Sequence, residues 1–188
     1  MQTRTEKGGK NSEGPIGTGL VIERRFTTIG EDPFDQFDWI EMDVEIRNAD
    51  GSLAHRIDDV RLPSGFSGVA GKVLAQKYLR KAGVPAILRK VKEKGVPTWL
   101  QRSEPDHEKL QSLDPEKRFI GESHGRELFR RLAGTWTYWG WKHGYFEAEA
   151  DARAYFDEMC YLIASQRSAP NSPQWFNTGL HWAYGIEG

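Results

Sequence analysis

The sequence has little cysteine and no excess of charge of either sign. Cys160 is the one cysteine among 188 residues, which excludes an intrachain disulfide and a zinc site built from several cysteines. The 26 basic and 27 acidic side chains give a formal net charge of −1, without the basic bias of nucleic-acid-binding proteins. Direct binding to nucleic acid is therefore not expected.

Long apolar runs are also missing. No stretch approaches the roughly 20 apolar residues of a membrane-spanning helix. Residues 1–20 are polar and rich in Gly, Lys and Glu, and they lack the apolar centre of a secretory signal. These absences predict a cytoplasmic protein with no membrane partner.

The motifs that mark several enzyme classes are absent as well. There is no Walker A loop, no GxGxxG and no HExxH, and no two histidines stand at metal-ligand spacing. No metal site is predicted. Cys160 lies beside the apolar stripe of a predicted helix and far from the N-terminus of that helix, so it is expected to be a buried, inert thiol. No residue is assigned a catalytic role.

The first part of the chain predicts a flexible lead and a β-hairpin. Residues 1–19 are expected to form the lead, either a disordered tail or an arm that orders on a partner. Val21–Thr27 is a candidate strand. Apolar residues alternate strictly from Ile40 to Ile46, and a turn with Gly51 follows, so residues 39–62 predict a hairpin. A change of phase at Asp58–Asp59 predicts a β-bulge.

Apolar residues at three- and four-residue steps then predict three helices. The first spans Gly68–Ala82, with Ser67 as N-cap and Gly83 at its end. The second begins after Ser123 as N-cap and ends near Gly140. The third spans about Glu147–Gln166 and should pack antiparallel to the second. Residues 84–121, punctuated by prolines, are expected to be irregular apart from a short helix near 106–113.

Two charged groups of these helices admit a structural or a functional interpretation. The basic residues of the first helix lie outside its apolar stripe, and form either a solvated face or a phosphate-binding face: Lys72, Lys77, Arg80 and Lys81. The acidic residues at the start of the third helix complement the helix dipole, so they need no metal or acid–base role: Glu147, Glu149 and Asp151.

The segment Ser168–Gly179 carries the most specific pattern. Pro170 and Pro173 are expected to hold the backbone extended, with Asn171 and Ser172 between them. A rigid loop of this kind offers a hydroxyl and main-chain N–H groups to a phosphate or ribose oxygen. A plain helix stop is the alternative.

Several motifs, in order, resemble one enzyme family. PNSPQWFNTG (170–179) resembles the loop that leads into the catalytic barrel of B12-dependent, class II ribonucleotide reductases. LAGTWTYWGW (132–141) is similar to the helix before that loop, and LAQKYLRKAGVP (74–85) and EIRN (45–48) are similar to the N-terminal region of the family. The resemblance runs from about Val21 to the last residue.

The resemblance implies a fold and a chemistry. The expected class is α+β, mainly α. The expected segments are a β-hairpin region (20–66), a helical domain (67–168) and the start of the substrate loop (169–188). In the family the helical domain packs on a ten-stranded α/β barrel, which is not expected within these 188 residues. Adenosylcobalamin is the implied cofactor, and its radical is passed to a cysteine whose thiyl radical abstracts the 3′ hydrogen of the ribose. A second cysteine pair reduces the 2′ carbon and is restored by an external thiol reductant such as thioredoxin.

The resemblance implies a substrate-binding role for Ser172 and, more weakly, for its neighbour Asn171. Cys160 matches none of the family's reactive cysteines, so the barrel is expected in cis or as a separate chain, and the 188 residues alone are expected to be inactive. A homodimer is compatible with the resemblance, and the choice between di- and triphosphate substrates stays open. The alternative is a non-catalytic helical module that binds a protein or a nucleotide.

Overall fold

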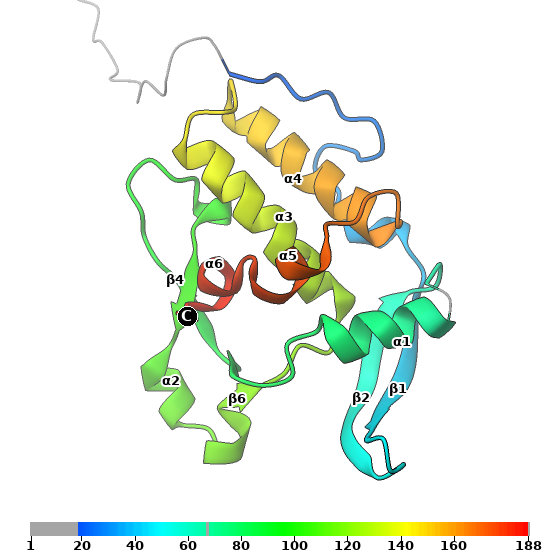
Figure 1. Cartoon of the computed structure of the whole chain (residues 1–188). Coiled ribbons are helices and arrows are strands. Elements are labelled where there is room, and N and C mark those ends of the chain that lie inside the picture. The colour runs from blue at the N-terminus through cyan, green and yellow to red at the C-terminus, as the bar shows by residue number, and fades with distance from the viewer. Residues whose placement is uncertain (1–18, 67, 188) are drawn as a thin grey trace, which may run out of the picture.

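Two long antiparallel helices lie at the centre of the molecule. The structure is a computed structural model that describes residues 19–66 and 68–187. Helix α3 (Gly125–Lys142) and helix α4 (Glu149–Ala164) pack side by side across a short connection (Figure 1). Leu128, Phe129 and Leu132 of α3 are fully buried, as the periodic apolar stripe predicted.

The N-cap of α3 is His124 and not Ser123. The Nδ1 atom of His124 accepts the Arg126 N–H at 3.1 Å, and the Glu127 carboxylate accepts the N–H groups of Ser123 and His124, each at 3.0 Å. Both sides of a capping box are thus present one residue later than predicted. Because a neutral imidazole nitrogen can accept a hydrogen bond as a serine hydroxyl does, residue type alone did not locate the cap.

The predicted hairpin is confirmed. Strand β1 (Trp39–Arg47) pairs antiparallel with β2 (Leu53–Pro63), and the register shifts between Met42 and Val44. The shift places an extra residue opposite Asp43, and Asp59 takes a positive φ of 55° there, so the predicted bulge is confirmed too. The inner face of the hairpin buries Val44, Val60 and Leu62 against the helices.

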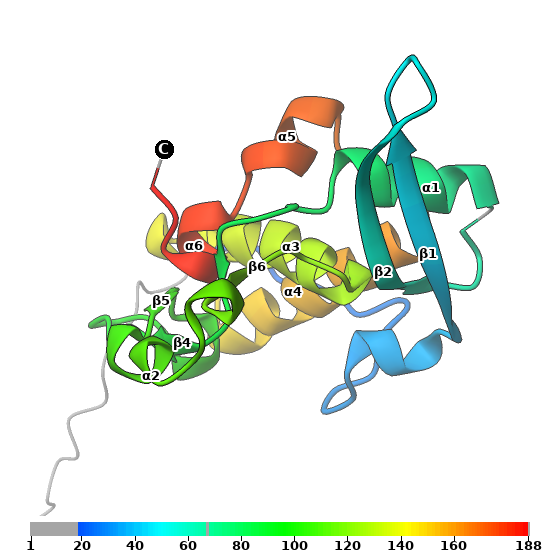
Figure 2. The same ribbon diagram turned by 90° about the horizontal axis from the view of Figure 1, so that it is seen from below.

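Helix α1 (Gly68–Lys77) is shorter than predicted. It packs on the hairpin at one end of the molecule (Figure 2). The chain leaves the helix before Arg80 because the buried Glu122 carboxylate accepts the Arg80 N–H at 2.8 Å, and the Glu122 N–H returns to the Arg80 carbonyl at 2.7 Å. The predicted cap, Ser67, lies outside the described residues, as do residues 1–18 of the predicted lead.

Residues 84–121 contain short strands that were not predicted. β3 (Val84–Pro85) pairs with β6 (Phe119–Ile120), and β4 (Leu88–Lys90) pairs with β5 (Ser103–Pro105). The short helix expected near 106–113 is confirmed as α2 (His107–Gln111). Strands of two or three residues leave no alternation to detect, and proline in two of them argued against strand. Short 3₁₀ helices lie at Thr98–Leu100 and Pro115–Lys117, and another lies before the hairpin at Pro33–Gln36.

The segment after Gly19 is not the strand that was predicted over Val21–Thr27. It runs extended along α4 and is held by carboxylates instead of a neighbouring strand (Figure 1). Asp151 accepts the Ile22 N–H at 2.9 Å, and Glu158 accepts the N–H groups of Phe26 and Thr27 at 3.0 and 2.9 Å. Asp151 also accepts the Ala148 N–H at 3.1 Å, so this residue both caps the start of α4 and binds the segment, whereas Glu158 binds it further along the helix.

Helices α5 (Ser172–Asn177) and α6 (Leu180–Tyr184) complete the fold and cross α3. Together with the hairpin and the two smaller sheets they confirm the α+β class. Within the described residues, no helix has both the length and the apolar character to cross a membrane.

Candidate functional site

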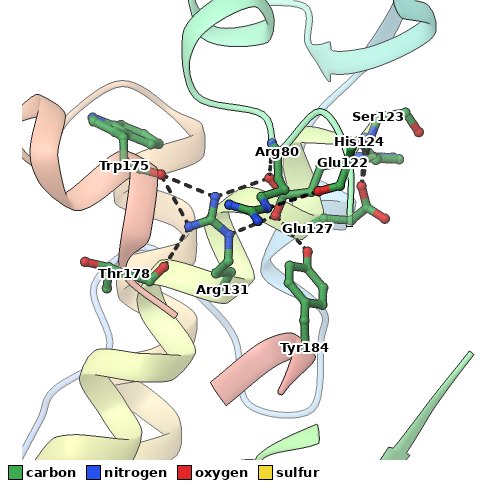
Figure 3. A network of polar contacts seen from close by, with 10 residues as sticks. Arg80, Glu122, Ser123, His124, Glu127, Arg131, Trp175, Thr178 and Tyr184 are labelled. Atoms are coloured by element: carbon green, nitrogen blue, oxygen red, sulfur yellow. Dashed lines mark hydrogen bonds and ion pairs between the residues drawn. The ribbon is translucent and has the colours of Figure 1, made fainter. Parts of the chain in front are cut away.

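A fully buried ion pair lies where α3 meets the C-terminal helices. Arg131 of α3 donates from Nε to Glu122 Oε1 at 2.8 Å and from Nη2 to Glu122 Oε2 at 3.2 Å (Figure 3). Both side chains are 0% exposed. A buried charge is tolerated only when it is paired and its remaining hydrogen-bonding positions are filled, so the partners of this pair define what it holds together.

Arg131 binds the end of α5. Its Nη1 donates to the Thr178 carbonyl at 2.6 Å, and both Nη atoms donate to the Trp175 carbonyl at 3.3 Å. Carbonyls in the last turn of a helix lack partners within the helix, so the guanidinium serves as the C-terminal cap of α5 (Figure 3).

Glu122 binds two further segments. Its Oε1 accepts the Tyr184 hydroxyl of α6 at 2.7 Å, and its Oε2 accepts the Arg80 N–H after α1. Burial, and next the negative charge of Glu122, raise the pKa of Tyr184 far above its ordinary value, so the phenol stays protonated as a donor. The ion pair therefore joins the segment after α1 to α3, α5 and α6.

The segment that was predicted to be an extended loop is helical. Ser172–Asn177 forms α5, and Pro173 lies in its first turn, where a proline has no lost hydrogen bond and no clash with a preceding turn. The indole N–H of Trp175 donates to the Pro170 carbonyl at 2.8 Å, which closes the start of the helix. The two prolines thus favoured a helix start rather than an extended loop.

Gly179 makes the turn between α5 and α6. Its φ is +87°, and a Cβ there would stand 2.3 Å from the Arg131 carbonyl oxygen and 2.6 Å from Thr135 Oγ1. Only glycine combines that backbone conformation with such close approach. Gly179 therefore sets the distance from α5 to α3 that the Arg131 cap requires.

The two predicted substrate residues lie at the start of α5 and are exposed. Ser172 Oγ is 3.0 Å from the Tyr78 hydroxyl, and the Tyr78 ring stacks on Trp175 with centroids 5.4 Å apart. Asn171 is the N-cap of α5, yet its side chain makes no capping bond. The structure thus brings Ser172 next to Tyr78, and leaves the Asn171 amide without a hydrogen-bond partner among the described residues.

Arg131, Glu122 and Tyr78 were not singled out from the sequence. Arg131 lies three residues after Leu128, on the apolar stripe of α3. A charged residue on a face that is expected to be buried was the one sequence feature that could have drawn attention to it. Its partners lie 44 and 47 residues further along the chain, and no local pattern encodes them.

Cys160 is fully buried on α4, which confirms the prediction of a buried thiol. Burial raises the pKa of the thiol well above its ordinary value, so Cys160 stays protonated and unreactive. Among the described residues, no group of three or more His, Cys, Asp or Glu side chains could hold a metal ion.

Comparison with known proteins identifies similar sequences. Residues 41–166 match the family described as class II vitamin B12-dependent ribonucleotide reductase. Over 169 residues the chain is 55% identical to the vitamin B12-dependent ribonucleotide reductase of Bradyrhizobium diazoefficiens and 54% identical to that of Agrobacterium fabrum. The reductase of Streptomyces avermitilis is 30% identical over 173 residues.

These matches cover most of this chain and a small part of each relative. The alignments include 90%, 90% and 91% of the chain, but 14%, 13% and 14% of the three relatives. The chain therefore corresponds to about one seventh of the length of these curated proteins.

Proposed function

Because the chain belongs to the class II vitamin B12-dependent ribonucleotide reductases, we propose that it is the N-terminal part of an enzyme that converts ribonucleotides to 2′-deoxyribonucleotides. The observation that carries the proposal is 55% identity across 90% of the chain to a reductase of which it matches only 14%. The chain supplies the framework before the catalytic barrel, and the barrel is supplied by further residues in cis or by a separate chain.

The chemistry of thiols is the reason for assigning the catalytic steps to the rest of the enzyme and not to this chain. Reduction of a ribose by this route needs one cysteine that carries a radical and a cysteine pair that supplies electrons. Cys160 is buried and protonated on α4, so it suits none of these roles. We assign the reactive cysteines to the rest of the enzyme, together with contacts to an external thiol reductant such as thioredoxin and to a second subunit, if the enzyme is a homodimer.

Adenosylcobalamin, in this proposal, supplies the radical when it is bound to the complete enzyme. None of the described residues is identified as a contact of this cofactor. We assign the cofactor to the remainder of the reductase and give no residue of this chain a role in binding it.

Ser172 is proposed to bind the substrate, with Asn171 beside it. Both are exposed at the start of α5, and Arg131 fixes the other end of that helix through the Trp175 and Thr178 carbonyls. The Tyr78 hydroxyl, 3.0 Å from Ser172 Oγ, orients the serine hydroxyl. A hydroxyl held in this way can donate to a phosphate or ribose oxygen without losing rotational freedom on binding.

The test is cobalamin-dependent reduction of ribonucleoside di- and triphosphates by the complete polypeptide that carries this sequence. We expect Ser172→Ala to raise KM about tenfold with little change in kcat, through loss of one hydrogen bond to a charged group. Ser168→Ala is the matched control, because Ser168 is exposed nearby but outside α5. Equal kinetics for the two variants would remove Ser172 from the site, and absence of any reductase activity would overturn the proposed function.

A further inference from the structure

A groove beside Ser172 concentrates positive charge. It has a volume of about 420 Å³ and lies between the end of α1 and α5, lined by Lys77, Tyr78, Leu79, Arg80, Lys81, Ala82, Phe176 and Asn177. Three of these side chains are cationic and none is acidic. Tyr78, which follows α1, packs on Trp175 and Phe176 of α5, so the basic residues around Tyr78 lie next to the aromatic and amide side chains of α5.

The cations of the groove are available to a ligand. Lys77 and Lys81 are exposed and form no ion pair within residues 19–66 and 68–187. Arg80 donates from Nε to the Ala82 carbonyl at 3.1 Å, which fixes its guanidinium and leaves both Nη groups without a hydrogen-bond partner in the same ranges. Elsewhere on the surface, arginines such as Arg61 are paired with carboxylates.

The walls of the groove are held in place by the buried ion pair. Glu122 fixes the backbone of Arg80 on one wall, and its partner Arg131 caps α5, which forms the other wall. The Tyr78 ring packs on Phe176 with centroids 5.3 Å apart, and the Tyr78 hydroxyl reaches Ser172. The groove is therefore preformed and continuous with the proposed substrate residue.

We infer that this groove binds the phosphate chain of a nucleotide. Lysine ammonium groups and an arginine with free Nη donors bind phosphate oxygens as point charges and as a fork, respectively. The Asn177 amide adds a polar contact, and Phe176, 44% exposed, gives the ribose or base an apolar surface. The identity of the ligand as a nucleotide rests on the proposed function, whereas the anion chemistry rests on the groove itself.

The first experiment uses amine acetylation of the complete polypeptide, read lysine by lysine by mass spectrometry, with and without sodium tripolyphosphate. We expect the anion to slow acetylation of Lys77 and Lys81 about fivefold or more, because a bound phosphate shields both amines. Lys72, on α1 outside the groove, and Lys94 are exposed internal controls and should keep their rates. If tripolyphosphate changed the acetylation rate of none of the four lysines, or slowed all four equally, the inference would be overturned.

The second experiment measures affinity by calorimetry. Replacing Lys77 and Lys81 together by Gln should weaken tripolyphosphate binding about tenfold, whereas the same change at Lys72 and Lys94 should leave it unchanged. Phe176→Leu should weaken binding of ATP but not of tripolyphosphate, since only ATP has a base and a ribose. Equal losses for the two lysine pairs would reveal a net-charge effect and reject the groove. Neither assay uses cobalamin or turnover, so failure here is distinct from failure of the proposed function.

Discussion

The ion pairs of the hairpin and the ion pair at the centre of the molecule have similar distances and different consequences. Arg61 and Glu41 approach to 3.0 Å across β1 and β2, and both side chains are about half exposed. Arg131 and Glu122 approach to 2.8 Å and are fully buried. Water competes for the first pair and screens it, whereas the second pair has lost its water and depends on protein donors and acceptors alone.

The two ion pairs therefore have different roles in the fold. The apolar alternation already determines the register of the hairpin, so the Arg61–Glu41 pair adds little to the stability of the fold. The central pair has partners on four segments, and the carbonyls of α5 reach no other cation among the described residues. The central pair is thus best understood as a fixed junction that places Ser172 and the basic groove, and not as a large net source of stability.

Breaking the junction should have the largest effect. Arg131→Met keeps the bulk of the side chain but leaves the Glu122 carboxylate buried without a cation, and we expect a loss of about 3–5 kcal/mol in the free energy of unfolding. Urea unfolding followed by tryptophan fluorescence measures this loss.

The matched control is the double variant Arg131→Met with Glu122→Gln. It removes the unpaired charge, while the amide oxygen can still accept the Arg80 N–H and the amide NH₂ can donate to the Tyr184 hydroxyl, which accepts as well as donates. The double variant should therefore be more stable than Arg131→Met alone, and a double variant that is less stable would contradict the assignment of the loss to a buried charge.

Two glycines have nearly equal positive φ angles but differ in how closely other atoms approach them. Alanine at each position therefore distinguishes the cost of a positive φ from the cost of a steric clash. Gly51 in the hairpin turn has φ +85° and no atom within 4 Å of the position that a Cβ would take, whereas Gly179 has φ +87° with the Arg131 carbonyl oxygen 2.3 Å from that position. Gly51→Ala should cost about 1 kcal/mol, from the positive φ alone. Gly179→Ala should cost about 2 kcal/mol more, because α5 must move away from α3. Equal losses in thermal or urea unfolding would show that α5 is not packed as tightly as the distance implies.

The His124 cap makes part of the stability depend on pH. Burial, and then the nearby Arg126, Arg61 and Arg130, lower the pKa of His124 below its ordinary value of 6.5. The unfolded chain therefore takes up a proton at higher pH than the folded chain does. The cap's contribution is complete above about pH 6.5 and is lost as the pH falls toward the lowered pKa of the folded state.

His124→Asn tests that dependence. Asparagine is a good N-cap and does not titrate, so stability at pH 7.5 should change by less than about 1 kcal/mol. Between pH 7 and pH 5 the wild-type protein should lose about 1 kcal/mol more than the variant. Unfolding curves at matched pH values give the difference, and parallel losses in the two proteins would exclude His124 as the titrating cap.

The sequence predicted the elements whose signals are local and repeated. The alternation from Ile40 to Ile46 specified the hairpin, and the change of phase at Asp58–Asp59 specified its bulge. Boundaries were less certain, because the α1 helix ends where a distant carboxylate, Glu122, takes the Arg80 N–H. Propensity contains no information about a partner 42 residues away.

The candidate site was predicted in part, for the same reason. Ser172 and Asn171 could be located through a motif, but α5 was taken for an extended loop because prolines stop helices and also start them. Arg131 was not singled out because it lies on the apolar stripe of α3 and binds carbonyls of α5, a helix that the sequence analysis did not predict. The sequence could not show that Phe176 and Asn177 lie opposite the basic residues at the end of α1, because that proximity depends on how α5 packs.

The smallest effect is expected at the hairpin pair, and it completes the comparison with the junction. A double-mutant cycle of Arg61→Gln and Glu41→Gln should give a coupling of about 0.5 kcal/mol at low salt, because both side chains are half exposed. At about 1 M salt the coupling should fall near zero, since screening acts over roughly 3 Å there. The corresponding cycle at Arg131 and Glu122 should keep its coupling at the same salt concentration, because ions do not enter the buried junction. A salt-independent hairpin coupling, or a salt-sensitive junction, would remove the distinction between the two regions.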